Sequence, residues 1–161
     1  EILKYHKKTD NLQESLNRQL ELSSLSIDEK IIGSITVDDV VEVIEENGKP
    51  MELVIERVPG SNEIPVALSF LLENKSFSCL LGLGVVIKGS TSHHHLVAES
   101  AGNAIQSLMI KHKTPIINGI IVTDDRQTAE ERIYGSIDRG REFAQSALQM
   151  AKLKGKWTTI S

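Results

Sequence analysis

The sequence is poor in the residues that characterise secreted, membrane-spanning or nucleic-acid-binding proteins. Cys79 is the only cysteine among 161 residues, so no disulfide can form within the chain, and we expect a buried, inert thiol. Aromatic residues make up 4% of the sequence and the formal net charge is −4, which argues against base stacking and against a basic surface for nucleic acid or anionic lipid. The longest apolar run, 79–87, is far shorter than the roughly 20 residues that cross a bilayer.

Length and composition favour one globular domain. The chain has the size of an ordinary domain, and its 40% of hydrophobic residues can supply a core without disulfides or metal. We therefore predict a single domain over residues 1–161, with a divergent region at about 1–50. A lone cysteine fits a reducing compartment, so we expect a cytoplasmic protein with no membrane partner and no nucleic acid. Because the sequence starts with Glu1 rather than Met, we also expect residues upstream of it.

Short segments rich in β-branched residues and bounded by turn residues are predicted to be strands: 51–58, 79–87 and 115–122. Segments with apolar residues at helical spacing follow them: 65–75, 95–112 and 138–155. The alternation of strand and helix predicts an α/β fold in which helices cover a parallel sheet. In such folds, ligands bind beyond the carboxyl ends of the strands.

The first fifty residues give a less regular pattern. Leucines at helical spacing predict an amphipathic helix over 11–25. Residues 30–49 are predicted to form a short strand, a turn capped by Asp38 and a helix that ends at Gly48.

Polar loops follow each predicted strand and, in a parallel sheet, would share one edge. The loop after the second strand reads "KGSTSHHH". Gly89 lets the backbone come close to a ligand, Ser90 and Thr91 offer hydroxyl groups, and the free amides of the following helix attract an anion. The pattern indicates a phosphate cradle. The competing interpretation is a hydroxyl N-cap behind a turn glycine.

Three consecutive histidines follow these hydroxyl residues. His93 and His95 form an H-x-H pattern that can hold a metal, but no third ligand stands at a recognisable spacing, so metal is the weaker interpretation. Another interpretation is that at least two of the three histidines simply face solvent in the first turn of a helix. A histidine beside an anion cradle is also placed to transfer protons near neutral pH, because the unperturbed pKa of its ring is about 6.5.

Charged residues elsewhere have two interpretations each. Arg132 and Arg139 lie in the charged stretch 129–142, which is typical of a solvated surface with ion pairs within a helix. An arginine is also the side chain best suited to hold a phosphate in a fork. Glu63 stands at a strand end, where it can act near a helix N-cap or accept hydrogen bonds from sugar-like hydroxyls.

Four motifs together resemble the lumazine synthase family of riboflavin biosynthesis. They are "VPGSNEIP", "GVVIKGSTSHHHLV", "NGIIVTDDRQTAEER" and "DRGREFAQSALQMA", in the order of the family over about residues 52–154. The resemblance implies a flavodoxin-like, three-layer α/β/α sandwich. It implies a transferase that condenses 5-amino-6-ribitylaminouracil with 3,4-dihydroxy-2-butanone 4-phosphate, without metal or organic cofactor. It also implies a homo-oligomer, because the family forms pentamers with active sites between subunits, and many members build an icosahedral shell.

Motif matching carries the family's phosphate site to this chain. Gly89, Ser90 and Thr91 fall where the family binds the phosphate of the butanone. Arg132 falls where a neighbouring subunit supplies an arginine to that phosphate. His93 occupies the position of the proton-transfer histidine.

The same matching suggests a site for the second substrate. Ser61, Asn62 and Glu63 fall where the family holds the pyrimidine and the ribityl chain, and Val86 and Ile87 fall where it lines the ring.

Three positions depart from the family pattern. Arg139 stands where the family usually has a lysine near the pyrimidine, which keeps the charge but changes its geometry. Asn62 and Asn118 stand where the family often has apolar or aromatic residues, so we expect a more polar pocket.

Residues 1–50 allow two alignments with the family's first strand, which ends in an aromatic residue that stacks on the substrate ring. In the one we favour, a strand ends at Tyr5, which is then the stacking residue, and residues around 27–48 are an insertion. In the other, 30–39 form the first strand, which has no aromatic residue at its end.

We expect an active lumazine synthase that forms pentamers, and we leave the shell open. The alternative is an inactive relative that binds flavin-like ligands or serves as a shell-forming protein. A general phosphate-binding α/β module is a more remote hypothesis, and a strictly monomeric state would support it.

Overall fold

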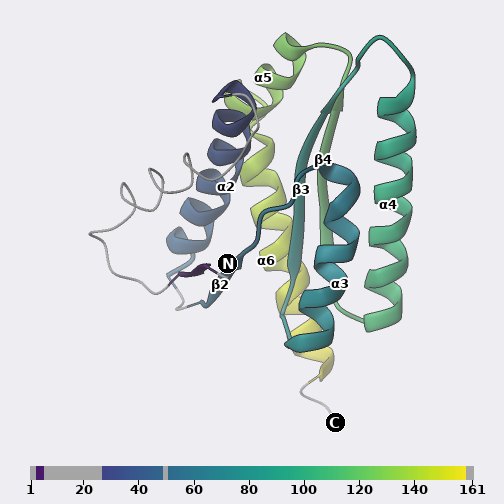
Figure 1. Ribbon diagram of the computed structural model, residues 1–161. Helices are drawn as coiled ribbons and strands as arrows, with labels where there is room; N and C mark the ends of the chain where they lie inside the picture. Colours follow the sequence, from purple (N-terminus) through teal and green to yellow (C-terminus); the bar gives the residue numbers. More distant parts are fainter. Residues whose placement is uncertain (1–2, 6–26, 49–50, 159–161) are drawn as a thin grey trace.

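The computed structural model describes residues 3–5, 27–48 and 51–158 (Figure 1). Its elements in chain order are β1 (Leu3–Tyr5), α2 (Ile27–Glu46), β2 (Leu53–Ile55), the short 3-10 helix η1 (Ser61–Glu63), α3 (Ile64–Asn74), β3 (Leu80–Ile87), α4 (His93–His112), β4 (Ile116–Thr123), α5 (Arg126–Tyr134) and α6 (Arg139–Thr158). Among the described residues, none of the helices combines the length and the apolar composition that a membrane span needs.

The centre of the fold is the parallel pair β3 and β4. Their register runs from Leu80 opposite Ile116 to Ile87 opposite Thr123, and α4 makes the crossover between them. Both strands coincide with predicted ones, because their apolar runs are even enough to be covered on both faces.

Helices cover both faces of this pair. Figure 1 shows α3 and α4 together on one side and α2 and α6 on the other. On the first face, Ile64, Leu68 and Ile105 form a core with residues of both strands. On the second face, Val43 and Ala144 form a core with residues of β3. The predicted α/β/α layering is confirmed.

The first predicted strand, 51–58, differs from the expectation. Only Leu53–Ile55 form a strand, and this strand, β2, pairs antiparallel with β1 instead of joining β3 and β4. The charged residues Glu52, Glu56 and Arg57 flank a short apolar core, and its three residues are only half-buried. A run this short cannot be covered on both faces as β3 is.

The prediction of a strand within 30–39 is wrong, since one continuous helix, α2, spans this segment. Val40, Val43 and Ile44 are buried against α6 and β3 at helical spacing. The β-branched residues suggested a strand, but packing on α6 overrides that local preference. The helix ends as predicted near Gly48, whose φ of 70° suits glycine and whose amide donates to the Glu45 carbonyl at 2.9 Å.

This helix also bears on the two alignments of the first fifty residues. The alignment that made 30–39 the first strand is excluded, while β1 ends at Tyr5, as the favoured alignment requires. However, the prediction that residues around 27–48 are an insertion is wrong, because α2 packs on α6 and β3 as part of the core. The helix predicted over 11–25 lies outside the described residues.

Candidate active site

The carboxyl ends of β3 and β4 meet at one edge. The amide of Lys88, the first residue after β3, donates to the Thr123 carbonyl at 2.9 Å. The Lys88 ammonium lies 3.6 Å from an Asp124 carboxylate oxygen, an exposed pair that contributes little to stability. The loops after these two strands therefore lie side by side, as the sequence predicted.

The turn η1 is held against the same part of the sheet. It packs on β3 and on α4, and it leads directly into α3, whose first turn contains Pro65. Ser61 lies over Gly84 of β3, where a β-carbon would come within 2.5 Å of the Ser61 hydroxyl oxygen. Glu63 is half-buried and its carboxylate turns back over Gly60, while Asn62 is exposed.

The loop between β3 and α4 is open to solvent. Val86 and Ile87 at the end of β3 are half-buried, whereas Gly89, Ser90 and Thr91 are exposed, and a β-carbon at Gly89 would meet no atom within 4 Å. An anion can therefore reach this backbone.

His93 begins α4 directly after this loop and is also exposed. Its backbone amide donates to the Thr91 hydroxyl oxygen at a distance of 3.5 Å. The structure thus keeps the loop and this histidine ring adjacent and accessible.

His94 is buried, which the sequence analysis did not anticipate. Its exposed fraction is 5%, and its Nδ1 lies 3.2 Å from the Thr91 carbonyl oxygen. The signal was present, because His94 continues the buried stripe of Ala101 and Ile105 one heptad toward the start of α4.

Arg132 and Arg139 lie on the other face of the sheet. Arg132 is half-buried in α5, which packs against α2 and α6 as well as the two strands. In Figure 1, α5 lies at the end of the sheet that carries the loop before α4, but on the side of α2 and α6. Arg139, at the start of α6, pairs with Glu142 at 2.5 Å.

Helix α5 itself was missed from the sequence, although it has a clear start signal. The Asp125 carboxylate accepts the Thr128 amide at 2.7 Å and so caps the helix. This backbone hydrogen bond is the main reason that the pKa of Asp125 is lowered from its usual value. The cap fixes the orientation of the helix that carries Arg132.

Asn118 and Tyr5 stand apart from these loops. Asn118 lies in the middle of β4, about 16 Å from Thr123 at roughly 3.3 Å per residue, and its side-chain oxygen accepts the Ile120 amide at 3.2 Å. Tyr5 pairs with Leu53 in the β1–β2 register. Their substrate contacts remain predictions.

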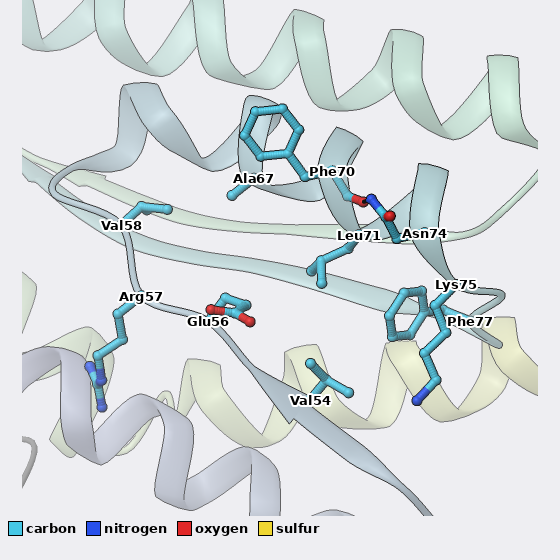
Figure 2. Close-up of a pocket in the computed structure, with 10 residues that line it drawn as sticks. All are labelled: Val54, Glu56, Arg57, Val58, Ala67, Phe70, Leu71, Asn74, Lys75 and Phe77. Atoms are coloured by element: carbon cyan, nitrogen blue, oxygen red, sulfur yellow. Dashed lines mark hydrogen bonds between the residues drawn. The ribbon is translucent and has the colours of Figure 1, made fainter. Parts of the chain in front are cut away.

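A cavity of about 620 Å³ lies between α3 and the segment that leads out of β2 (Figure 2). Its walls include Val54, Val58, Leu71 and Phe77, and Phe70 stands at its rim with 60% of its surface exposed. None of the predicted substrate-binding residues that the structure describes lines it. The cavity is therefore separate from the site at the strand ends.

Comparison with known proteins assigns these motifs to one family. The family profile described as 6,7-dimethyl-8-ribityllumazine synthase matches residues 27–155. Proteins of that name are similar to this chain in Nitrosomonas europaea (34% identity over 130 residues, covering 81% of this chain and 75% of the relative) and in Burkholderia mallei (38% over 117 residues, covering 72% and 66%). A Polaromonas relative is 38% identical over 97 residues, covering 60% of this chain and 61% of its own.

The match includes α2 together with every element that carries the loops at the strand ends. The resemblance inferred from the four motifs is thus confirmed, and the chain belongs to the 6,7-dimethyl-8-ribityllumazine synthase family.

Proposed function

We propose that this protein condenses 5-amino-6-ribitylaminouracil with 3,4-dihydroxy-2-butanone 4-phosphate to give 6,7-dimethyl-8-ribityllumazine, phosphate and water. The observation that carries the proposal is the family match over 27–155 in a chain whose strand-end loops are exposed and adjacent. In this reaction Gly89, Ser90 and Thr91 bind the phosphate of the butanone.

His93 is the proposed proton shuttle. Schiff-base formation, phosphate elimination and ring closure each move a proton close to the leaving phosphate, which an imidazole beside the phosphate loop can do. Its exposed position two residues after Thr91 supports this role. Much of the remaining acceleration comes from holding two substrates in register, for which effective molarities of about 10⁵ M or more are known.

The second substrate is proposed to bind beside η1. Ser61, Asn62 and Glu63 supply backbone groups, an amide and a carboxylate for the pyrimidine and the ribityl hydroxyls. Val86 and Ile87 offer apolar contact to the ring. The packing of η1 on β3 supports this arrangement, because it brings both groups of residues to one end of the sheet.

We further propose that each site is completed by another copy of the chain, within a pentamer. Arg132 belongs to the layer of α2 and α6, whereas His93 belongs to that of α3 and α4, which supports an arginine that serves a neighbour. Large apolar side chains exposed on α3 and α4 support burial against another copy; they are Val66, Phe70, Leu96 and Ile110. Assembly into an icosahedral shell and a cytoplasmic location are compatible further proposals.

The test is to mix purified protein with both substrates and follow lumazine formation by absorbance and fluorescence. We expect His93→Ala to lower kcat by about 10²-fold or more. We expect Arg132→Ala to act mainly by raising the KM for butanone phosphate. Pentamers that give no product above the uncatalysed background would instead favour the inactive, ligand-binding or shell-forming alternative.

A mixing experiment tests the shared site directly. His93→Ala and Arg132→Ala subunits are unfolded together, refolded and assayed beside each variant refolded alone. If the two residues act across a subunit boundary, some mixed sites contain both wild-type side chains and part of the activity returns. No recovery, or a species near 17.8 kDa in sedimentation velocity, would contradict a shared site.

A further inference from the structure

The proposed reaction gives no role to His94, a buried residue that contacts the proposed phosphate loop from the protein interior. His94 is 5% exposed, and its side chain is directed into the protein while its neighbours His93 and His95 are exposed. Its Nδ1 lies 3.2 Å from the Thr91 carbonyl oxygen, and its Nε2 is fully buried without a hydrogen-bond partner. A buried polar atom without a partner costs stability, so this ring calls for an explanation.

The contact with Thr91 fixes which nitrogen carries the proton. A carbonyl oxygen can only accept a hydrogen bond, so Nδ1 must donate to it. In the neutral ring the proton is therefore on Nδ1, and the buried Nε2 carries a lone pair. The arrangement is specific, because the opposite tautomer would put two acceptors face to face.

The same contact sets the orientation of the loop. Thr91 precedes the first residue of α4, so its carbonyl is not part of the helical ladder, whose first bond runs from the His95 amide to the Ser92 carbonyl at 3.1 Å. The Thr91–Ser92 peptide is trans, since the described chain has no cis peptide bond. In a trans peptide, the carbonyl and the amide hydrogen point in opposite directions. When the Thr91 carbonyl turns inward to His94, the Ser92 amide turns outward, toward solvent.

We propose that His94 is a positioning residue for phosphate binding: it holds the Thr91–Ser92 peptide so that the Ser92 amide faces the anion. This rests on the proposed function of the loop Gly89–Thr91. The free amides at the start of a helix attract anions, but only when they point at the ligand. We expect the role to be specific to one substrate, because the hydrogen bond of His94 is made to the loop for the phosphate.

Two substitutions separate the hydrogen bond from the packing of the ring. His94→Phe retains an aromatic ring of similar size but cannot donate to Thr91. His94→Asn is smaller, but its side-chain amide stands close to the position of Nδ1 and restores the donor. His95→Phe is the control, because His95 is exposed in the same turn and its ring contacts that of His94, with centroids 4.0 Å apart.

The measurements are the KM for each substrate and the Kd for inorganic phosphate by calorimetry. We expect His94→Phe to raise the KM for butanone phosphate and the Kd for inorganic phosphate about tenfold, as for loss of one well-placed donor to an anion. The KM for the aminouracil should change little, and both His94→Asn and His95→Phe should stay within about threefold of wild type. Equal effects on both substrates, or no rescue by asparagine, would overturn the proposal.

Two of the readouts, phosphate binding and NMR of the histidine rings, do not depend on turnover. Phosphate binding tests the role of His94 even if the wild type forms no lumazine, in which case the proposed reaction fails while the positioning role is still measured. If His94→Phe does not fold, ¹⁵N NMR of the wild-type imidazoles decides the question. A proton on Nδ1 is expected, and a ring whose only proton is on Nε2 would overturn the assignment.

Discussion

The hydroxyl of Ser61 lies directly over the α-carbon of Gly84. A β-carbon at Gly84 would come within 2.5 Å of the Ser61 hydroxyl oxygen and within 3.2 Å of the Ile64 side chain, so η1 can pack on β3 only because this residue is glycine. We expect Gly84→Ala to lower the free energy of unfolding by about 1–3 kcal/mol, as other overpacking changes do. We also expect this substitution to raise the KM for the aminouracil more than the KM for the butanone phosphate, because η1 is displaced. Kinetics that change equally for both substrates would contradict this role of η1.

Gly155, unlike Gly84, has room for a side chain. It lies exposed within α6, and a β-carbon there would meet no atom within 4 Å. Because alanine restricts the unfolded chain and favours the helix, we expect Gly155→Ala to raise the free energy of unfolding by about 0.5–1 kcal/mol. Urea unfolding at one fixed protein concentration measures it. A loss of stability would mean that the backbone at 155 is not free to accept a side chain.

Lys154 connects the end of α6 to the segments that enter both central strands. Its ammonium donates to the Phe77 carbonyl at 2.7 Å and to the Thr114 hydroxyl at 2.9 Å. We expect Lys154→Met to lower the free energy of unfolding by about 1–3 kcal/mol, because the buried Thr114 hydroxyl and the Phe77 carbonyl lose their donor. Lys152→Met is the matched control, since Lys152 is exposed on the same helix. Similar unfolding curves for the two variants would show that these hydrogen bonds are replaced by water.

The two central strands and the exposed loop between β3 and α4 were predictable from sequence, because evenly apolar runs bounded by turn residues favour buried strands that end in a loop. The helix over 30–39 was not predictable, because the isoleucines and the single valine of this segment suit a strand and a buried helix equally. The helix that contains it packs through Val43 and Ile44 in one cluster with Ala144 of α6, which joins residues about a hundred positions apart. Local pattern carries no information on such a pairing.

The buried His94 shows a different limit. Its place in the apolar stripe of α4 was readable, but the interpretations weighed for the three histidines were solvation, metal binding and proton transfer, and none of them was burial. The structure separates them, because a helix turns by about 100° per residue and only the middle ring faces the core. Residues contributed by another copy of the chain, as we propose for Arg132, cannot be placed from one chain at all.

Cys79 is expected to react slowly despite being only half-buried. Burial raises the pKa of its thiol to about 11, against which the backbone hydrogen bonds and Lys154 act only weakly. At pH 8 about one thiol in a thousand is then ionised, and the thiolate is the reactive form. Labelling with a disulfide reagent should therefore be much slower in the native protein than in urea. Equal rates in the two states would show that the native thiol is as accessible and as readily ionised as that of the unfolded chain.

Asp39 is expected to make the protein more stable in mild acid than at neutral pH. One of its carboxylate oxygens is buried without a hydrogen-bond partner, and a β-carbon on the neighbouring Gly140 would lie within 2.8 Å of it. Burial raises the pKa of Asp39 above its ordinary value of 3.8, and the nearby carboxylates of Asp138, Asp38 and Glu42 raise it further, while Arg141 opposes them.

The sign of the effect follows from which state binds the proton more tightly. Because the folded pKa of Asp39 is the higher one, its contribution favours folding fully below pH 3.8 and is lost as the pH rises through the folded value. Asp39→Asn keeps the shape of the neutral acid, so it should raise the free energy of unfolding at pH 7, by less than about 1 kcal/mol because solvent screens a partly exposed group. The gain should shrink as the pH falls through the raised pKa of Asp39, because the wild-type carboxyl then takes up its own proton. Urea unfolding of both proteins from pH 4 to 8 measures this difference. An asparagine variant that is less stable at pH 7 would mean that attraction between Asp39 and Arg141 outweighs burial.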